Sequence, residues 1–186
     1  MMKNVKRLLV KMGIKKLKGT IIVLGLANSG KSTIVNWLKD PHDQIQEISP
    51  TVGYSVEQVQ MDKCKLTVVD LSGQLKYAKL WECYYEDAQG IVFVVDACDP
   101  DKLVQAKDVM MEAVTDDRLR RLPLVIFANK SDLPESLSGL EVTTHMDLNN
   151  SLHAYKSWNV FSSSAVSGDG LKDGLRWLLA LLKVKP

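Results

Sequence analysis

Residues 21–32 read IIVLGLANSGKS, an apolar run followed directly by the pattern G-x-x-x-x-G-K-S. The apolar run predicts a buried strand, and the pattern predicts a tight glycine-rich turn that opens a helix. In such a turn the backbone N–H groups and the helix N-terminus face an anion. A turn without a ligand is the alternative, but the strand-to-helix context favours a phosphate-binding loop.

The polar residues of this loop indicate a nucleotide with a magnesium ion. Lys31 is expected to bridge the β- and γ-phosphates, and the Ser32 hydroxyl is expected to bind Mg²⁺. The predicted phosphate contacts are Gly25, Ala27, Asn28, Ser29, Gly30, Lys31, Ser32 and Thr33.

A second apolar run, residues 66–69, ends in the sequence DLSGQ at residues 70–74. A carboxylate at the carboxyl end of a strand is suited to hold Mg²⁺ through water, which we predict for Asp70. The Gly73 N–H is expected to reach the γ-phosphate. Because D-x-x-G alone is more often a simple turn, this interpretation depends on its position after the phosphate-binding loop.

A third apolar run, residues 124–128, is followed by NKSD at residues 129–132. The Asp132 carboxylate can accept hydrogen bonds from N1–H and the 2-amino group of guanine, which adenine lacks. Asn129 is expected to tie the loops together, and the Lys130 stem to lie across the ring. A solvated loop with a helix cap is the alternative in isolation. After the next strand, a backbone N–H of Ser164 or Ala165 is expected to meet guanine O6.

Short apolar runs alternate with helical patterns along residues 20–186, which predicts an α/β fold with a six-stranded mixed sheet and five flanking helices. The connection around Asp62 is too short for a crossover, so the second and third strands should form an antiparallel hairpin. The strands are predicted at 20–25, 53–61, 65–70, 90–96, 123–128 and 158–163. The helices are predicted at 30–39, 75–86, 100–115, 139–152 and 169–183. All the motifs then meet at the carboxyl edge of the sheet.

Composition excludes several classes of protein. The 186 residues fit one domain, and no apolar run reaches the roughly 18 residues that span a bilayer. Cys64, Cys83 and Cys98 have no metal-ligand spacing and follow no signal peptide, so we expect reduced thiols in a cytoplasmic monomer. The three histidines are scattered, so no transition-metal site is expected.

The polar segment 41–50 is followed by Thr51, whose hydroxyl is expected to complete the Mg²⁺ shell only when a γ-phosphate is present. The sequences PTVGY at 50–54, DLSGQ at 70–74, NKSD at 129–132 and SGDGL at 167–171 together resemble the Arf family of small GTPases. Within that family, residues 70–74 and LWECYY at 80–85 are most similar to the ciliary Arf-like branch, which recruits the Bardet-Biedl coat complex.

The resemblance implies a P-loop G domain that switches between GTP and GDP with Mg²⁺ and hydrolyses GTP slowly. Gln74 would orient the attacking water, and a GAP would supply the arginine that segment 41–50 lacks. An exchange factor would reload GTP. Effector or coat proteins would read the state through Tyr54, Val69, Trp81 and Tyr84, although Val69 replaces the family's usual tryptophan. Plain core packing of Trp81 and Tyr84 is an alternative, and a GTP-binding scaffold with negligible hydrolysis is the alternative function.

Residues 1–19 carry seven Lys or Arg residues and no acid, with apolar residues at helical spacing. The segment therefore predicts a basic amphipathic helix that attaches peripherally to an anionic membrane, with the cilium or basal body implied by the resemblance. A helix docked permanently on the domain is the alternative. No aromatic platform accompanies the charge, so no nucleic-acid binding is expected. Met2 and Lys3 stand where N-myristoylation requires glycine at position 2, so membrane affinity should be modest.

Overall fold

The computed structural model describes residues 17–62 and 64–182, and the predicted N-terminal helix lies outside these ranges. A six-stranded sheet forms the centre, in the order β2-β3-β1-β4-β5-β6. β2 and β3 pair antiparallel as a hairpin, and the other neighbours are parallel. The predicted mixed sheet is therefore confirmed. Its strands are β1 (Leu17–Leu24), β2 (Tyr54–Met61), β3 (Cys64–Leu71), β4 (Gly90–Asp96), β5 (Leu124–Asn129) and β6 (Trp158–Ser163).

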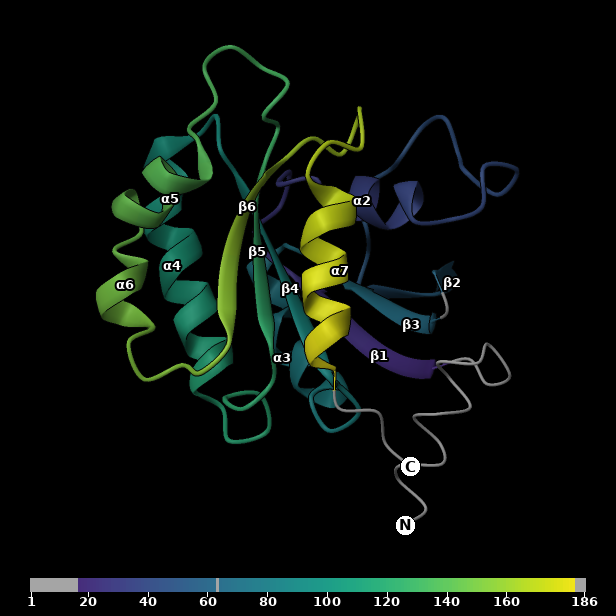
Figure 1. Cartoon of the computed structure of the whole chain (residues 1–186), viewed down its shortest axis with the longest axis horizontal. Helices are drawn as coiled ribbons and strands as arrows, with labels where there is room; N and C mark the ends of the chain where they lie inside the picture. Colours follow the sequence, from purple (N-terminus) through teal and green to yellow (C-terminus); the bar gives the residue numbers. More distant parts are fainter. Residues whose placement is uncertain (1–16, 63, 183–186) are drawn as a thin grey trace.

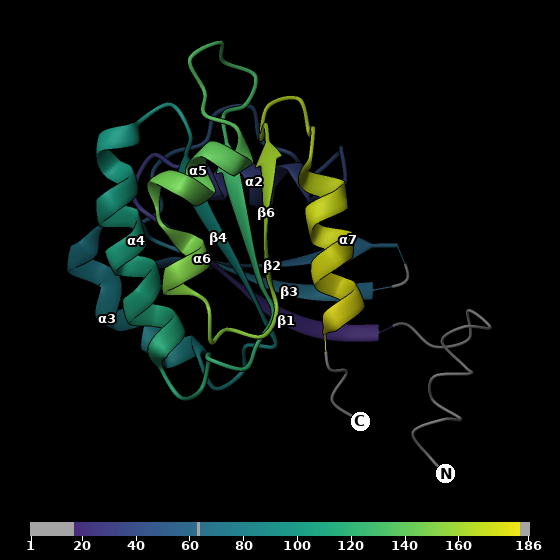
Figure 2. The same ribbon diagram turned by 60° about the vertical axis from the view of Figure 1, so that its left-hand side comes forward.

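Helices cover both faces of the sheet, as Figures 1 and 2 show. One face carries α4 (Pro100–Thr115), α5 (Gly139–His145) and α6 (Leu148–Ser151), and the other carries α2 (Lys31–Trp37) and α7 (Leu171–Leu181). The central strands β4 and β5 are consequently almost completely buried, which is why they are continuous apolar runs rather than alternating ones.

The last helix shows how the apolar stripe predicted from its sequence packs. Leu171, Leu175 and Leu178 are buried against the sheet, while Leu179 and Leu182 are partly buried at the edge of the same cluster. At roughly 2 kcal/mol for each fully buried leucine, the stripe is a main attachment of α7 to the sheet.

Two predicted helices are interrupted in the structure. The helix predicted at 139–152 is divided into α5 and α6 by Asp147, whose φ of 48° is left-handed. An α-helix cannot continue through that conformation, although aspartate tolerates it. The described residues therefore form one α-helix more than predicted.

The helix predicted at 75–86 is instead a 3-10 turn (Leu75–Tyr77), the short helix α3 (Ala78–Trp81) and a second 3-10 turn (Glu82–Tyr84). Trp81 Nε1 donates to the Ser72 carbonyl at 3.0 Å, so this segment is tied to the turn that follows β3. At the start of the chain, β1 begins at Leu17, so the last residues of the predicted 1–19 segment belong to the sheet.

Candidate functional site

The turn between β1 and α2 needs glycine at two positions. Gly25 has φ 140° and Gly30 has φ 96°, both in the range that favours glycine. A Cβ atom on Gly25 would lie 2.2 Å from the Val94 carbonyl oxygen, and one on Gly30 would lie 2.1 Å from Asn129 Nδ2. The predicted phosphate-binding loop is therefore pressed against both the neighbouring strand and the predicted base-recognition motif.

Lys31 is buried at the first position of α2. Its ammonium donates to the Leu26 carbonyl at 2.7 Å. Burial lowers the pKa of Lys31 to about 8, against the opposing attraction of Asp70. Gly73 lies directly over this group, because a Cβ atom there would be 2.4 Å from Ala27 N and 2.5 Å from Lys31 Nζ. A buried cation with backbone N–H groups beside it is suited to bind a phosphate.

Three predicted magnesium ligands come together from three separate segments. Ser32 Oγ donates to Asp70 Oδ2 at 2.5 Å, and Thr51 Oγ1 lies 2.8 Å from Ser32 Oγ and 3.2 Å from Asp70 Oδ2. The other oxygen, Asp70 Oδ1, is buried without a hydrogen-bond partner among the described residues. Burial is also the main reason that the pKa of Asp70 is raised.

This oxygen-only cluster fits Mg²⁺, which prefers carboxylate, hydroxyl and water oxygens. Ser32 and Thr51 would hold the ion directly and Asp70 through water. The ion would supply a positive charge beside the phosphates.

Asn129 connects the base-recognition loop to its neighbours. This buried side chain donates from Nδ2 to the Ser29 carbonyl at 2.8 Å and accepts from Ala165 N at 3.0 Å. One amide therefore joins the phosphate-binding loop, the end of β5 and the loop after β6. Asp132, three residues farther along the chain, is exposed.

The loop after β6 is more fully bonded than the sequence suggested. The N–H of Ala165 already donates to Asn129, and the N–H of Ser164 donates to the Asp169 carbonyl. The Ser164 hydroxyl in turn accepts from Val166 N and Ser167 N at 3.3 and 3.1 Å. A guanine O6 would therefore have to share the Ala165 N–H with Asn129, which motif reading alone did not anticipate.

The residues predicted to meet effectors divide into a surface pair and a core pair. Tyr54 is 51% exposed, and its ring packs against that of Tyr84 at a tilt of 52° with a centroid separation of 4.9 Å. Val69 and Trp81 are buried in the core in this conformation, which agrees with the core-packing alternative for Trp81 and leaves neither side chain open to a partner. Gln74 follows Gly73 in the turn, where its backbone N–H lies 3.4 Å from Ser72 Oγ.

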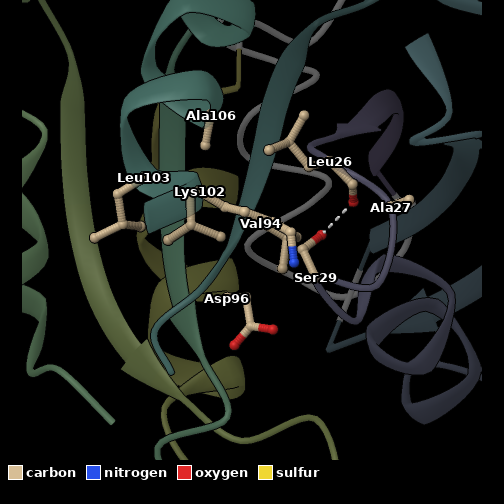
Figure 3. Close-up of a pocket in the computed structure, with 9 residues that line it drawn as sticks. Leu26, Ala27, Ser29, Val94, Asp96, Lys102, Leu103 and Ala106 are labelled. Atoms are coloured by element: carbon tan, nitrogen blue, oxygen red, sulfur yellow. Dashed lines mark hydrogen bonds between the residues drawn. The ribbon is translucent and has the colours of Figure 1, made fainter. Parts of the chain in front are cut away.

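Sequence reasoning missed one charged residue of the site, Asp96. It ends β4, much as Asp70 is the last residue but one of β3, and its carboxylate pairs with Lys130 Nζ at 2.5 Å. The signal was available, because residues 90–95 are a continuous apolar run that stops at this aspartate. Figure 3 shows Asp96 below Val94 and Ser29, in the lining of a small, mostly apolar hollow between the phosphate-binding loop and α4.

Comparison with known proteins agrees with this geometry. A sequence model of the ADP-ribosylation factor family matches residues 5–182. ADP-ribosylation factor-like protein 6 from Danio rerio is 42% identical over 169 residues, which is 90% of each chain. Among solved structures, the Arl6 BBS3 small GTPase from Trypanosoma brucei with bound nucleotide analogue GppNp matches with a TM-score of 0.81 and 32% identity. That match covers 88% of this chain and 96% of the other. None of the described helices combines the length and apolar character required to cross a bilayer.

Proposed function

This chain belongs to the ADP-ribosylation factor family, and from that premise we propose how its residues carry out the switch. It is an Arf-like small GTPase, a P-loop enzyme that hydrolyses GTP and uses guanine nucleotide with Mg²⁺. The proposal concerns what its residues do in this cycle, which partners read it and where it works.

The observation that carries the proposal is the contact of Thr51 with Ser32 and Asp70. Thr51 lies near the end of the mostly exposed and irregular segment 38–53, whereas Ser32 and Asp70 are fixed by α2 and β3. Holding this segment on the magnesium site orders many residues at a cost in conformational entropy. We infer that γ-phosphate and Mg²⁺ offset that cost and that hydrolysis releases Thr51 together with Gly73.

In the hydrolysis step, Gln74 would orient the attacking water, while Lys31 and the loop N–H groups would stabilise charge that develops on the phosphate oxygens. No arginine occurs between residues 41 and 50 to complete this stabilisation. A GAP would therefore supply the arginine, and the unassisted rate should be on the order of 10⁻⁴ s⁻¹, as in Ras.

Partners would read the GTP state on the surface formed by the start of β2 and the neighbouring segment 80–84. Tyr54, Val56 and Leu80 are 51%, 48% and 39% exposed, and Tyr84 packs on Tyr54. Exposed aromatic and aliphatic side chains of this kind are typical contact residues of protein interfaces. The similarity to Arl6 relatives supports effector or coat proteins of ciliary trafficking as these partners.

Residues 1–19 would attach the GTP-bound form peripherally to membranes, since they combine seven basic residues with an apolar stripe. Liposome flotation of the full chain with GTP and GDP analogues tests this part. Greater binding of the GTP form is expected, and equal partitioning of both forms would contradict it.

The switch itself is tested by titration calorimetry followed by a single-turnover assay. The purified chain should prefer GDP to ADP by about 10⁴-fold and should hydrolyse GTP slowly until a GAP is added. A protein with no preference between GDP and ADP would overturn the assigned pocket, and an unassisted rate near 1 s⁻¹ would overturn the need for a GAP. Affinity capture with the GTP-loaded Gln74→Leu variant would then identify the partners.

A further inference from the structure

Asp96 and Lys130 occupy the ends of two neighbouring strands. Asp96 closes β4 and stands in register with Asn129, the last residue of β5. Lys130 follows immediately, so its side chain has to cross from the end of β5 to reach the end of β4. It does so, because Lys130 Nζ lies 2.5 Å from Asp96 Oδ2.

The two oxygens of Asp96 are used separately. Oδ1 accepts from the backbone N–H of Cys98 at 3.0 Å, which fixes the carboxylate within its own turn. Oδ2 is thereby directed at the Lys130 ammonium. The Asp96 side chain is only 14% exposed and that of Lys130 only 26% exposed, so solvent screens this ion pair less than a surface pair.

The backbone end of Lys130 is fixed as well. Its φ of 72° is left-handed, which is uncommon for a residue with a side chain. The Lys130 carbonyl accepts from Leu133 N at 3.0 Å and receives the Cys98 thiol at 3.7 Å. With both ends held, the four-carbon stem loses most of the rotamer freedom that a lysine side chain ordinarily has.

We propose that Asp96 is a positioning residue, which holds the Lys130 stem in place as a preformed apolar platform for one face of the guanine ring. Without this ion pair the stem would have to be ordered each time a nucleotide binds, and ordering a flexible group weakens binding. Asp96 thus acts on nucleotide residence time through Lys130 and touches no phosphate. The inference rests on guanine nucleotide binding by this pocket.

The test is a double-mutant cycle on the full chain. Asp96→Asn keeps an oxygen for the Cys98 N–H but removes the charge that holds Lys130. Lys130→Met keeps an unbranched apolar stem but removes the ammonium. The release of fluorescently labelled GDP is measured with excess unlabelled GDP and Mg²⁺ for the wild type, both single variants and the double variant.

Each single variant should release nucleotide about tenfold faster than the wild type, as expected for a partly buried charge-assisted bond. The double variant should stay within about twofold of the faster single variant, because both substitutions break the same contact. The matched control is Asp99→Asn, which removes a negative charge from the same turn. The Asp99 carboxylate pairs with Lys102 and not with Lys130. It should change release by less than about twofold.

Three results would overturn the proposal. They are an approximately hundredfold effect of the double variant, an effect of Asp99→Asn equal to that of Asp96→Asn, and a wild-type rate for Lys130→Met. The Lys130→Met variant leaves the hydrogen bond between Asp96 and the Cys98 N–H intact. Its release rate therefore tests the proposal even if Asp96→Asn fails to fold. A wild-type chain that failed to retain labelled GDP would instead refute the nucleotide pocket on which the proposal rests.

Discussion

The two ends of the nucleotide site use buried polar groups in opposite ways. At the base end, Asn129 has both ends of its amide in hydrogen bonds, and Lys130 is paired with Asp96. At the phosphate end, Asp70 Oδ1 has no partner among the described residues, and burial lowers the pKa of Lys31 to about 8. The Asn129 amide and the Lys130 ammonium therefore have partners without a ligand, although Ser163 Oγ at the end of β6 has none among the described residues, whereas the phosphate end leaves one oxygen of its carboxylate unpaired.

This difference separates recognition from switching. We expect a preassembled base end to discriminate between bases in every state of the cycle, because its contacts do not depend on the phosphate. Buried charges that lack full compensation are costly, so the phosphate end gains stability only when phosphate and Mg²⁺ arrive. Its structure should therefore follow the identity of the bound nucleotide, which is the property that a switch requires.

The largest effect should come from removing the buried cation of the phosphate end. Lys31→Ala should weaken GDP binding about a thousandfold, roughly the 4 kcal/mol typical of losing one partner from a buried charged contact. Titration calorimetry of the nucleotide-free chain measures the change. Lys39→Ala, which breaks the outlying pair with Glu57, is the control and should alter affinity less than twofold. A loss below tenfold for Lys31→Ala would show that the two ends do not differ as described.

The base end should respond in specificity as well as in affinity. Asp132→Asn replaces an acceptor for guanine N1–H and the 2-amino group by an amide that also donates, so GDP affinity should fall about a hundredfold. Xanthosine diphosphate (XDP) should bind this variant more tightly than it binds the wild type, because xanthine carries an oxygen where guanine carries the amino group. Competition of GDP, XDP and ADP against a labelled nucleotide measures this exchange of preference. Glu135→Gln, an exposed neighbour, should leave the ranking unchanged, and an unchanged ranking for Asp132→Asn would refute its role.

At the phosphate end, one substitution should change the rate of GTP hydrolysis without changing the affinity for GTP. Gln74→Leu should slow single-turnover GTP hydrolysis roughly thirtyfold, since the attacking water would no longer be oriented, while GTP affinity changes less than about twofold. Gln58→Leu, on the outer strand β2, is the control. Equal losses of affinity and rate would mean that Gln74 supports the pocket rather than the reaction.

Much of this architecture was predictable because local patterns agree with the tertiary structure. The apolar runs that became β4 and β5 are buried on both faces, and no other element fits them. Strand ends in a parallel sheet meet at one edge, so the contact between Ser32 and Asp70 followed from motif order, whereas Thr51 comes from the segment before the antiparallel strand β2.

Other features depend on contacts that periodicity does not encode. The break at Asp147 is a single left-handed residue within a pattern that otherwise reads as one helix. Trp81 is buried and bonds to the Ser72 carbonyl, and its sequence position alone left open whether it contacts a partner or packs in the core. The pairing of Asp96 with Lys130 joins residues 34 positions apart, and only the register of β4 with β5 brings them together.

The smallest predicted effect is a change of nucleotide affinity with pH, which tests the contrast between the phosphate end and the base end. Lys31 of the free protein has a pKa of about 8, because burial disfavours its ammonium form. Bound phosphates favour that charged form and raise the pKa, so binding takes up a proton when the pH exceeds about 8. Nucleotide affinity should therefore fall as the pH rises, by at most about tenfold between pH 7 and pH 9.

The substitutions at the two ends should separate in this pH titration. Lys31→Arg should flatten the curve, since a guanidinium stays charged throughout the range, whereas Asp132→Asn should bind more weakly but keep the same slope. Calorimetry in buffers of different ionisation enthalpy would measure the proton uptake directly. If nucleotide affinity still fell with rising pH in Lys31→Arg, the titrating group would not be Lys31. The pH dependence would then no longer support the contrast between the two ends of the site.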